Sequence, residues 1–230
     1  MITNSEEQIF VIIPAFNEAT VIQDVTKEVQ SAGYKNIIIV DDGSTDNTQS
    51  IAQQIPGIIS LKLSINRGKG AAVKTGIEAA KILDADIVVT IDGDGQHNPK
   101  DIKKMLELIK KGNDVVLGSR LLNPNPKGMP IWKIVANHFG NFCTWAIYGL
   151  WVTDSQSGFR AYSKKAINLI NTKTDRYEYD SEVIREIAQN KLHYIEIPIE
   201  VRYTEYSKGK KNKMNLLNGA KTLIKMIISV

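Results

Sequence analysis

Short runs of apolar, often β-branched residues alternate along the chain with longer segments in which apolar residues recur every three or four positions. The short runs predict strands at residues 10–13, 36–40, 58–63, 87–91 and 115–117. The longer segments predict helices at residues 18–32, 46–54, 69–83 and 100–111. Strands that alternate with helices build a mostly parallel sheet with helices on both faces, so we expect an α/β fold of the Rossmann-like, nucleotide-binding kind.

Length and composition agree with a single globular unit. The chain has 230 residues, 43% of them hydrophobic, and no linker-like stretch divides it. This composition excludes a disordered, collagenous or coiled-coil protein. The lone cysteine, Cys143, excludes an internal disulfide, and residues 1–8 are polar and acidic where a secretory signal would be basic and then apolar. We therefore expect a protein of the reducing cytosol.

The positive charge of the chain is concentrated at its end. Residues 201–230 carry seven Lys and Arg against one Glu, whereas residues 1–200 sum to a small negative charge. This pattern suits anionic lipid, and we expect no nucleic-acid partner. Residues 214–230 show apolar and basic sides at helical spacing, which predicts an amphipathic helix after a main domain of residues 1–213. That helix lies either on a membrane surface or on the domain.

Polar residues follow four of the predicted strands. Because ligands of parallel sheets bind beyond the carboxyl ends of the strands, we expect these segments to meet in one cleft. Asp, Gly, Ser and Asn are common in turns, so a turn alone accounts for the polar residues of any one segment. It accounts less easily for polar residues after all four strands. The four segments are residues 14–18, 41–46, 92–97 and 118–120.

Asp92 and Asp94 are the sharpest pair in these segments. In an extended segment their carboxylates point the same way, and two close anions require a cation between them. Hard oxygen ligands suit Mg²⁺ or Mn²⁺, and Gln96 lies two residues further on the same face. His97 is either a fourth ligand or a turn residue. Gly93 separates the two acids, and no phosphate-binding loop of the Walker type is present in the chain, so the metal is expected to hold the phosphates.

Three further segments contain residues with a candidate structural or binding role. Residues 66–70 open a predicted helix with Arg67, Lys69 and two glycines, which brings cations and free backbone N–H groups to the cleft. Asp180 is expected to be a helix N-cap. Residues 131–152 hold all three tryptophans and no acid, but polar residues interrupt them, so this segment is an interfacial or acceptor-lining helix, or else a plain buried one.

The combination of motifs resembles the family 2 glycosyltransferases, and within them the polyprenol-phosphate (dolichol-phosphate) mannosyl- and glucosyltransferases. The resemblance runs from about Phe10 to Ser207. It implies a GT-A fold, a nucleotide-sugar donor with GDP or UDP, a divalent metal, an inverting transfer and a polyprenyl phosphate acceptor. It rests on Pro-Ala-Phe-Asn-Glu at 14–18, Asp-Asp-Gly-Ser-Thr-Asp at 41–46, Arg-Gly-Lys-Gly at 67–70, Asp-Gly-Asp-Gly-Gln-His at 92–97, Gly-Ser-Arg at 118–120 and Asp-Ser-Gln-Ser-Gly-Phe-Arg at 154–160.

The resemblance also implies roles for individual residues. Asp92, Asp94 and Gln96 would hold the metal on the donor diphosphate, and Arg120 would meet the lipid phosphate. Asp154 and the acids within residues 177–182 are candidate bases should the acceptor be a hydroxyl; a phosphate monoester is mostly deprotonated at pH 7 and needs none. The remaining residues would bind the donor: Pro14, Ala15, Phe16, Glu18, Val40 and Asp42 around base and ribose, and Lys69, Gly93, Arg202 and Lys208 around the phosphates.

These observations predict a metal-dependent glycosyltransferase that acts on a polyprenyl phosphate, peripherally at the cytoplasmic face of the membrane. Two alternatives remain open. One is a glycosyltransferase for a soluble acceptor in polysaccharide or glycoprotein synthesis, in which the terminal helix merely packs on the domain. The other is a nucleotide-sugar-binding protein without turnover, against which Asp92 and Asp94 argue.

Overall fold

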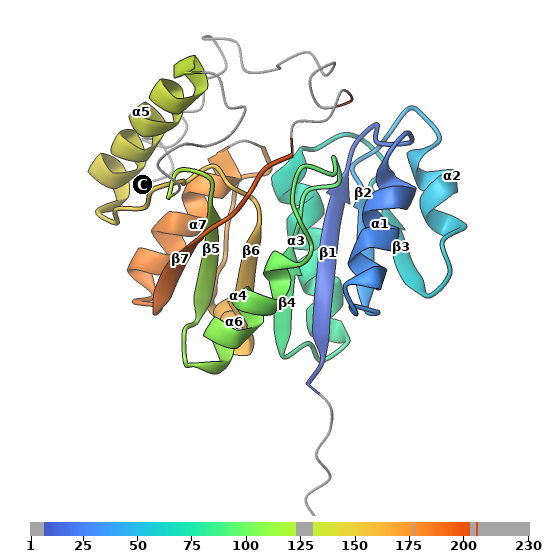
Figure 1. The fold of residues 1–230 in the computed structure, drawn as a ribbon, viewed down its shortest axis with the longest axis horizontal. Helices are drawn as coiled ribbons and strands as arrows, with labels where there is room; N and C mark the ends of the chain where they lie inside the picture. The colour runs from blue at the N-terminus through green and yellow to red at the C-terminus, as the bar shows by residue number, and fades with distance from the viewer. Residues whose placement is uncertain (1–6, 123–130, 177, 203–205, 207–230) are drawn as a thin grey trace, which may run out of the picture.

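A computed structural model describes residues 7–122, 131–176, 178–202 and 206, with the side chains of residues 131–133 excepted. Its centre is a seven-stranded sheet with the strand order β3-β2-β1-β4-β6-β5-β7 (Figure 1). The strands are β1 (Ile9–Ala15), β2 (Ile37–Asp41), β3 (Ile58–Lys62), β4 (Ile87–Thr90), β5 (Val115–Ser119), β6 (Arg160–Ser163) and β7 (Tyr194–Pro198). The helices are α1 (Ile22–Ser31), α2 (Thr48–Gln53), α3 (Lys69–Ile82), α4 (Asp101–Lys110), α5 (Ile131–Tyr148), α6 (Lys164–Leu169) and α7 (Glu178–Gln189).

The sheet has two differently built halves. From β3 to β4 all neighbouring strands are parallel, with Val11 opposite Ile37 and Ile9 opposite Ile87. β6 then runs antiparallel to both β4 and β5, and β5 pairs in parallel with β7. The mostly parallel sheet and the predicted α/β class are thus confirmed, and the five predicted strands and four predicted helices all form. The antiparallel strand β6 was not predicted.

Alternation along the strands divides the core between the two faces of the sheet. Val11 and Ile13 point to the face covered by α1, α2 and α4, whereas Phe10 and Ile12 point to the face covered by α3, α6 and α7. Gly76 lets α3 lie close to the sheet, because a Cβ there would come within 2.4 Å of the Ile12 side chain. This close packing fixes the start of α3 beside the carboxyl ends of β1 and β2.

Helix α5 is placed differently from the other helices: it lies beyond the carboxyl end of the sheet and beside α7 (Figure 1). Its polar residues Asn141 and Thr144 are buried, whereas Phe139, Phe142 and Trp145 are about half exposed. This is the reverse of an ordinary surface helix, and it contradicts the plain buried helix that the sequence left open. Among the described helices, none has the length and apolar character that crossing a membrane requires.

Candidate active site

A pocket opens at the carboxyl ends of β1, β2 and β4, where the order of strands places the three predicted polar segments side by side. Asn66, Gly68, Ala72 and Arg176 complete its wall from α3 and from the loop before α7. The predicted site residues that line it are Pro14, Ala15, Phe16, Glu18, Asp42, Lys69, Asp92, Gly93 and Asp94.

Asp42 organises one wall of the pocket. Its carboxylate accepts the backbone N–H groups of Arg67 (2.9 Å) and Gly68 (2.8 Å) and the amide of Asn66 (3.0 Å). The loop before α3 is therefore fixed against the end of β2. The expectation of free N–H groups at this helix start is wrong for Arg67 and Gly68, because Asp42 already binds both of them.

The segment after β1 is held from both sides. The backbone N–H of Glu18 donates to the Thr48 hydroxyl (2.8 Å), and the Tyr206 hydroxyl donates to the Glu18 carboxylate (2.8 Å) and to the Asn17 carbonyl (3.1 Å). Burial and the neighbouring Glu18 carboxylate raise the pKa of Tyr206, so its hydroxyl stays protonated and donating. Sequence reasoning gave Tyr206 no role, since only the fold brings it to Glu18.

Asp92 is engaged by two side chains. One carboxylate oxygen lies 2.7 Å from the Lys69 ammonium, and the other lies 3.2 Å from Nε2 of His97. The ring of His97 packs against the ring of Phe159, with 5.1 Å between the two ring centroids. Removal from water opposes ionisation of Asp92, but Lys69 and His97 outweigh it and hold its pKa below the ordinary value. Lys69 also lies 3.5 Å from Asp180. His97 thus contacts the first acid of the motif directly.

Asp94 lies on a turn rather than on an extended segment. Gly95 has a positive φ of 74°, and Asp94 accepts the N–H of Gln96 at 3.1 Å, so the expectation of a straight segment from Asp92 to Gln96 is wrong. A Cβ on Gly93 would meet the Pro14 carbonyl oxygen at 2.9 Å, so glycine lets this turn lie against β1. Both Asp92 and Asp94 still line the pocket, whereas Gln96 does not appear among its lining residues.

The donor chemistry of this wall fits a hard divalent cation. In the described part of the chain no three His, Cys, Asp or Glu side chains come together as a metal site. Mg²⁺ commonly takes only one or two protein carboxylates and completes its shell with phosphate and water oxygens. Lys69 and His97 contact both oxygens of Asp92, and Asp94 accepts the N–H of Gln96.

The fourth polar segment lies elsewhere. β6 separates β5 from β4, and Arg120, just beyond β5, does not line the pocket, so the expected single cleft of four strand ends is wrong for this segment. The Arg120 side chain forms a two-pronged pair with Asp154, through Nε at 2.6 Å and Nη2 at 2.7 Å. Its backbone N–H donates to Asp154 as well, at 3.0 Å. The buried Asp154 therefore orients Arg120, and both of its oxygens are in use.

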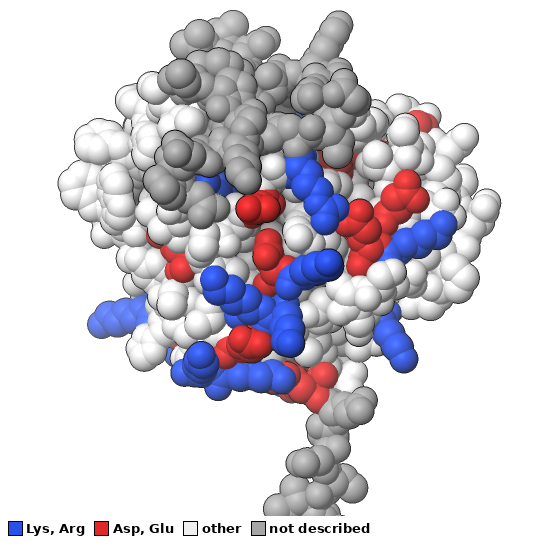
Figure 2. Space-filling view, in the orientation of Figure 1, with Lys and Arg blue, Asp and Glu red and all other residues white. Residues whose placement is uncertain are grey.

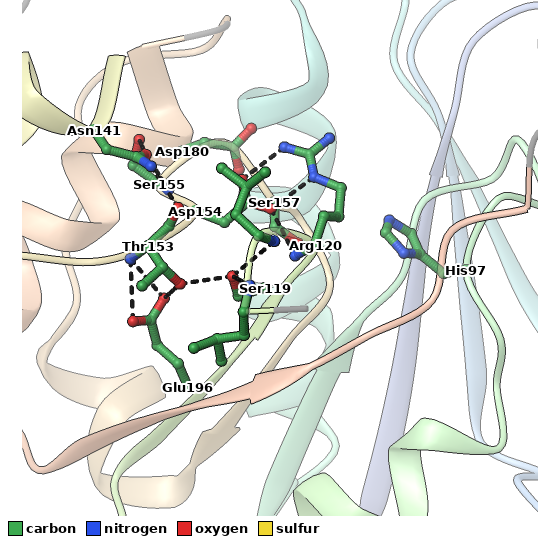
Figure 3. A network of polar contacts seen from close by, with 12 residues as sticks. His97, Ser119, Arg120, Asn141, Thr153, Asp154, Ser155, Ser157, Asp180 and Glu196 are labelled. Atoms are coloured by element: carbon green, nitrogen blue, oxygen red, sulfur yellow. Dashed lines mark hydrogen bonds and ion pairs between the residues drawn. The ribbon is translucent and has the colours of Figure 1, made fainter. Parts of the chain in front are cut away.

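A chain of hydrogen bonds ties Asp154 to helix α5 (Figure 3). Asn141 accepts the N–H and the hydroxyl of Ser155, both at 2.9 Å, and donates to the carbonyl of Thr153. The Thr153 hydroxyl contacts Ser119 at 2.6 Å and donates to Glu196 at 2.8 Å. The polar side of α5 thus fixes the segment that carries Asp154, while His97 stands apart from this network in the same view.

The other predicted residues take different positions. Arg202 pairs with Glu28 on α1 at 2.8 Å, outside the pocket, and Val40 lies in the core beneath Asp42. Asp180 is the third residue of α7 and not its N-cap, because this helix begins at Glu178. Lys208, the boundary at residue 213 and the terminal helix at 214–230 lie outside the described residues. Arg176 lines the pocket but was missed, since no motif marks its loop.

Comparison with known proteins supplies the context for this geometry. A family model described as Glycosyl transferase family 2 matches residues 10–170. The UDP-N-acetylglucosamine–dolichyl-phosphate N-acetylglucosaminyltransferase of Methanococcus voltae is 39% identical over 97% of this chain and 96% of its own length. The polyprenol monophosphomannose synthase of Mycolicibacterium smegmatis is 24% identical over 91% of this chain and 83% of its own.

Solved structures support the fold. Glucosyl-3-phosphoglycerate synthase from Mycobacterium tuberculosis, in complex with Mn²⁺, UDP and glucosyl-3-phosphoglycerate, superposes with a TM-score of 0.70 at 20% identity. The superposition covers 97% of this chain and 80% of that one. Mannosyl-3-phosphoglycerate synthase from Rubrobacter xylanophilus gives a TM-score of 0.68 at 14% identity over 97% and 73% of the two chains. The expected GT-A architecture is thereby confirmed.

Proposed function

The chain belongs to glycosyl transferase family 2, and from this premise we propose that it transfers a sugar, with inversion, from a nucleotide-sugar to a polyprenyl phosphate. Membership makes the chain a glycosyltransferase, which removes the alternative of a binding protein without turnover. The observation that carries the acceptor proposal is the linkage of Arg120, through Asp154 and Asn141, to a helix whose apolar side is exposed.

The donor side of the proposal rests on the pocket. A nucleoside diphosphate leaves with its negative charge, and a divalent cation bound by Asp94 with the diphosphate would act as a Lewis acid and stabilise that charge. Asp42 holds the loop at the start of α3, and Glu18 and Phe16 lie at the end of β1, so the pocket has a wall for the base and ribose. The 39% identity to an enzyme named for UDP-N-acetylglucosamine places that donor first for testing.

The acceptor side rests on Arg120. A guanidinium binds a phosphate through two parallel hydrogen bonds, and Asp154 holds this one in a fixed orientation. A phosphate monoester has a second pKa of about 6, so it is mostly a dianion at pH 7 and can attack the sugar without a general base. This chemistry leaves Asp154 as a positioning residue, in agreement with the engagement of both its oxygens by Arg120.

The exposed side of α5 supports a place for the lipid. Phe142 and Trp145 lie 5.7 Å apart, and Trp145 lies 6.0 Å from Trp151, all of them at least two fifths exposed. In Figure 2 the part of the surface at α5 that is not grey is mostly white, which marks residues other than Lys, Arg, Asp and Glu. Tryptophan favours the headgroup level of a bilayer. We place this side of the enzyme against the cytoplasmic face of a membrane, with the acceptor phosphate reaching Arg120.

The test is a panel of radiolabelled nucleotide-sugars, with UDP-N-acetylglucosamine and GDP-mannose among them, offered with a short-chain polyprenyl phosphate in Mg²⁺ or Mn²⁺. We expect label in the organic phase for one donor, and none when the matching polyprenol without phosphate replaces the acceptor. Label that appears only on added soluble sugars, with none on the lipid, would favour the soluble-acceptor alternative.

A further inference from the structure

The loop before α7, residues 171–176, is held at one end by carboxylates of that helix. Glu182, 1% exposed at its side chain, accepts the N–H groups of Lys173 (3.0 Å) and Thr174 (2.8 Å) and the Thr174 hydroxyl (2.5 Å). Glu186 accepts the N–H of Asn171 at 3.1 Å. A buried carboxylate that binds three donors leaves the loop little freedom. The path of the chain toward Arg176 is therefore fixed.

The other end of the loop docks on the start of α3. The Asp175 carboxylate lies 2.8 Å from the Arg67 guanidinium and 2.6 Å from the Lys74 ammonium. The backbone carbonyl of Asp175 accepts the N–H of Ala71 at 3.1 Å. Gly68 makes this contact possible, because a Cβ there would lie 2.5 Å from the Asp175 carbonyl oxygen. The loop is thus bound to α7 at one end and to the start of α3 at the other, and together with the start of α3 it forms one wall of the pocket.

Arg176 is the residue that this wall presents to the pocket. Its side chain is packed against Gly68, where an added Cβ would come within 2.7 Å of Cγ, and the residue lines the pocket. Within the described part of the chain, no carboxylate pairs with it. Lys69, the other cation of the lining, is already bound to Asp92 and lies near Asp180. Arg176 therefore keeps its charge and its hydrogen-bond donors for a ligand.

We propose that Arg176 binds the diphosphate of the nucleotide-sugar donor. The inference rests on the proposed function and adds a donor-binding residue from the loop before α7, beside the start of α3. A guanidinium beside the start of α3 offers an anion a full positive charge and a planar pair of donors. Two acids of the lining are already engaged by other groups, Asp42 by backbone N–H groups and Asp92 by Lys69.

A thermodynamic cycle separates a phosphate contact from a structural role. UDP, UMP, uridine and GDP are titrated by calorimetry into the wild type, Arg176→Gln and Arg176→Lys in Mg²⁺. Lys173→Gln is the matched control, since Lys173 is an exposed cation of the same loop that does not line the pocket. We expect Arg176→Gln to weaken binding of the preferred nucleoside diphosphate about 10- to 100-fold, as the loss of a charge-assisted pair would, and to leave uridine unchanged. Arg176→Lys should restore part of the affinity, and Lys173→Gln should bind as the wild type does.

Three outcomes would overturn the inference. Unchanged diphosphate affinity in Arg176→Gln would show that the guanidinium makes no contact, and equal loss for uridine and diphosphate would show a general disturbance of the pocket. A wild type that binds neither UDP nor GDP would remove the ligand itself. The proposed acceptor is tested separately: an enzyme that shows the Arg176 effect on UDP but labels no polyprenyl phosphate keeps this inference and loses the proposed function.

Discussion

The two halves of the sheet differ in how their polar residues are held. In the parallel half, from β3 to β4, Asp42 is bound by residues 66–68, and Asp92 is bound by Lys69 and His97. In the half that contains β5, β6 and β7, Arg120 depends on Asp154, which is 34 residues away, and the segment of Asp154 depends on α5. The parallel half carries a pocket at its strand ends. The other half carries Arg120, whose partner Asp154 lies in a segment bonded to α5, a helix with one apolar side.

The difference agrees with the proposed roles of the two halves, one in donor binding and the other in acceptor binding. Short loops with closely spaced acids suit a polar ligand and its metal, whereas α5 has its polar side turned inward to hold the network and its apolar side turned outward. A helix with this orientation is unfavourable in water unless a further surface covers it. We therefore assign the nucleotide to the parallel half and the lipid phosphate to the other half.

The largest effect is expected in the parallel half, at Asp94. Asp94→Asn removes one charge from the wall that faces the diphosphate, and loss of metal assistance costs several kcal/mol, or about a thousandfold in kcat. Initial rates of sugar transfer in Mg²⁺ measure the loss in kcat. Asp84→Asn is the control, because it makes the same change at an exposed surface position. Near-normal turnover of a folded Asp94→Asn enzyme would remove the carboxylate-bound metal from the account.

The second effect concerns stability in the other half. Asn141→Ala deletes three hydrogen bonds beneath α5 and leaves the buried Ser155 groups without that partner, which should cost about 3 kcal/mol. For a chain of this length the melting temperature should fall by roughly 10 °C. Asn168→Ala, an exposed asparagine bonded to one carbonyl, should change it little. Equal melting temperatures for the two variants would contradict the anchoring role of the network.

The third effect concerns acceptor use. Arg120→Ala should lower kcat/KM for the polyprenyl phosphate about 10- to 100-fold, because a charge-assisted pair is lost, and should leave nucleotide affinity unchanged. Arg120→Lys should recover little, since an ammonium does not reproduce the fork that Asp154 orients. Kinetics with varied acceptor and calorimetry with the nucleotide measure the two sides separately. Loss of nucleotide affinity alone would move Arg120 to the donor side.

The smallest effect concerns the exposed side of α5. Changing Phe142 and Trp145 together to Ser should weaken co-sedimentation with vesicles about tenfold or more, at about 1 kcal/mol for each partly inserted side chain. Ile82→Ser is the control, because Ile82 is 84% exposed and lies at the end of another helix, α3. If the control weakens binding as much as the double variant does, the α5 surface has no special role.

The sequence predicted the parallel half better than the other half for a physical reason. Pro14, Asp42, Asp92 and Asp94 follow predicted strands, and the rule for parallel sheets places the ends of those strands together. Arg120 was read with them because the pattern does not show the antiparallel β6 that separates β5 from β4. The partners of Lys69, Tyr206 and Asp154 are likewise distant in sequence, and a single chain without comparison carries no signal for such contacts.

The orientation of α5 lay beyond sequence reasoning in another way. Residues 131–152 alternate apolar and polar positions, but periodicity does not say which side faces the protein. The buried Ser155 and the neighbouring Thr153 decide this, because the Ser155 N–H and hydroxyl and the Thr153 carbonyl all bond to Asn141. The sequence predicts an N-cap at Asp180 for a similar reason, because it does not show that Lys69 and Arg160 of other elements lie beside this carboxylate.

The division between the halves is tested most directly by a crossed binding measurement. Calorimetry of the preferred nucleoside diphosphate with Mg²⁺, and of a water-soluble short-chain polyprenyl phosphate, is carried out on the wild type, Asp94→Asn and Arg120→Ala. The account predicts that Asp94→Asn weakens the nucleotide and spares the lipid phosphate, whereas Arg120→Ala weakens the lipid phosphate and spares the nucleotide. Both ligands weakened to the same degree by either variant, or the opposite pattern, would contradict it.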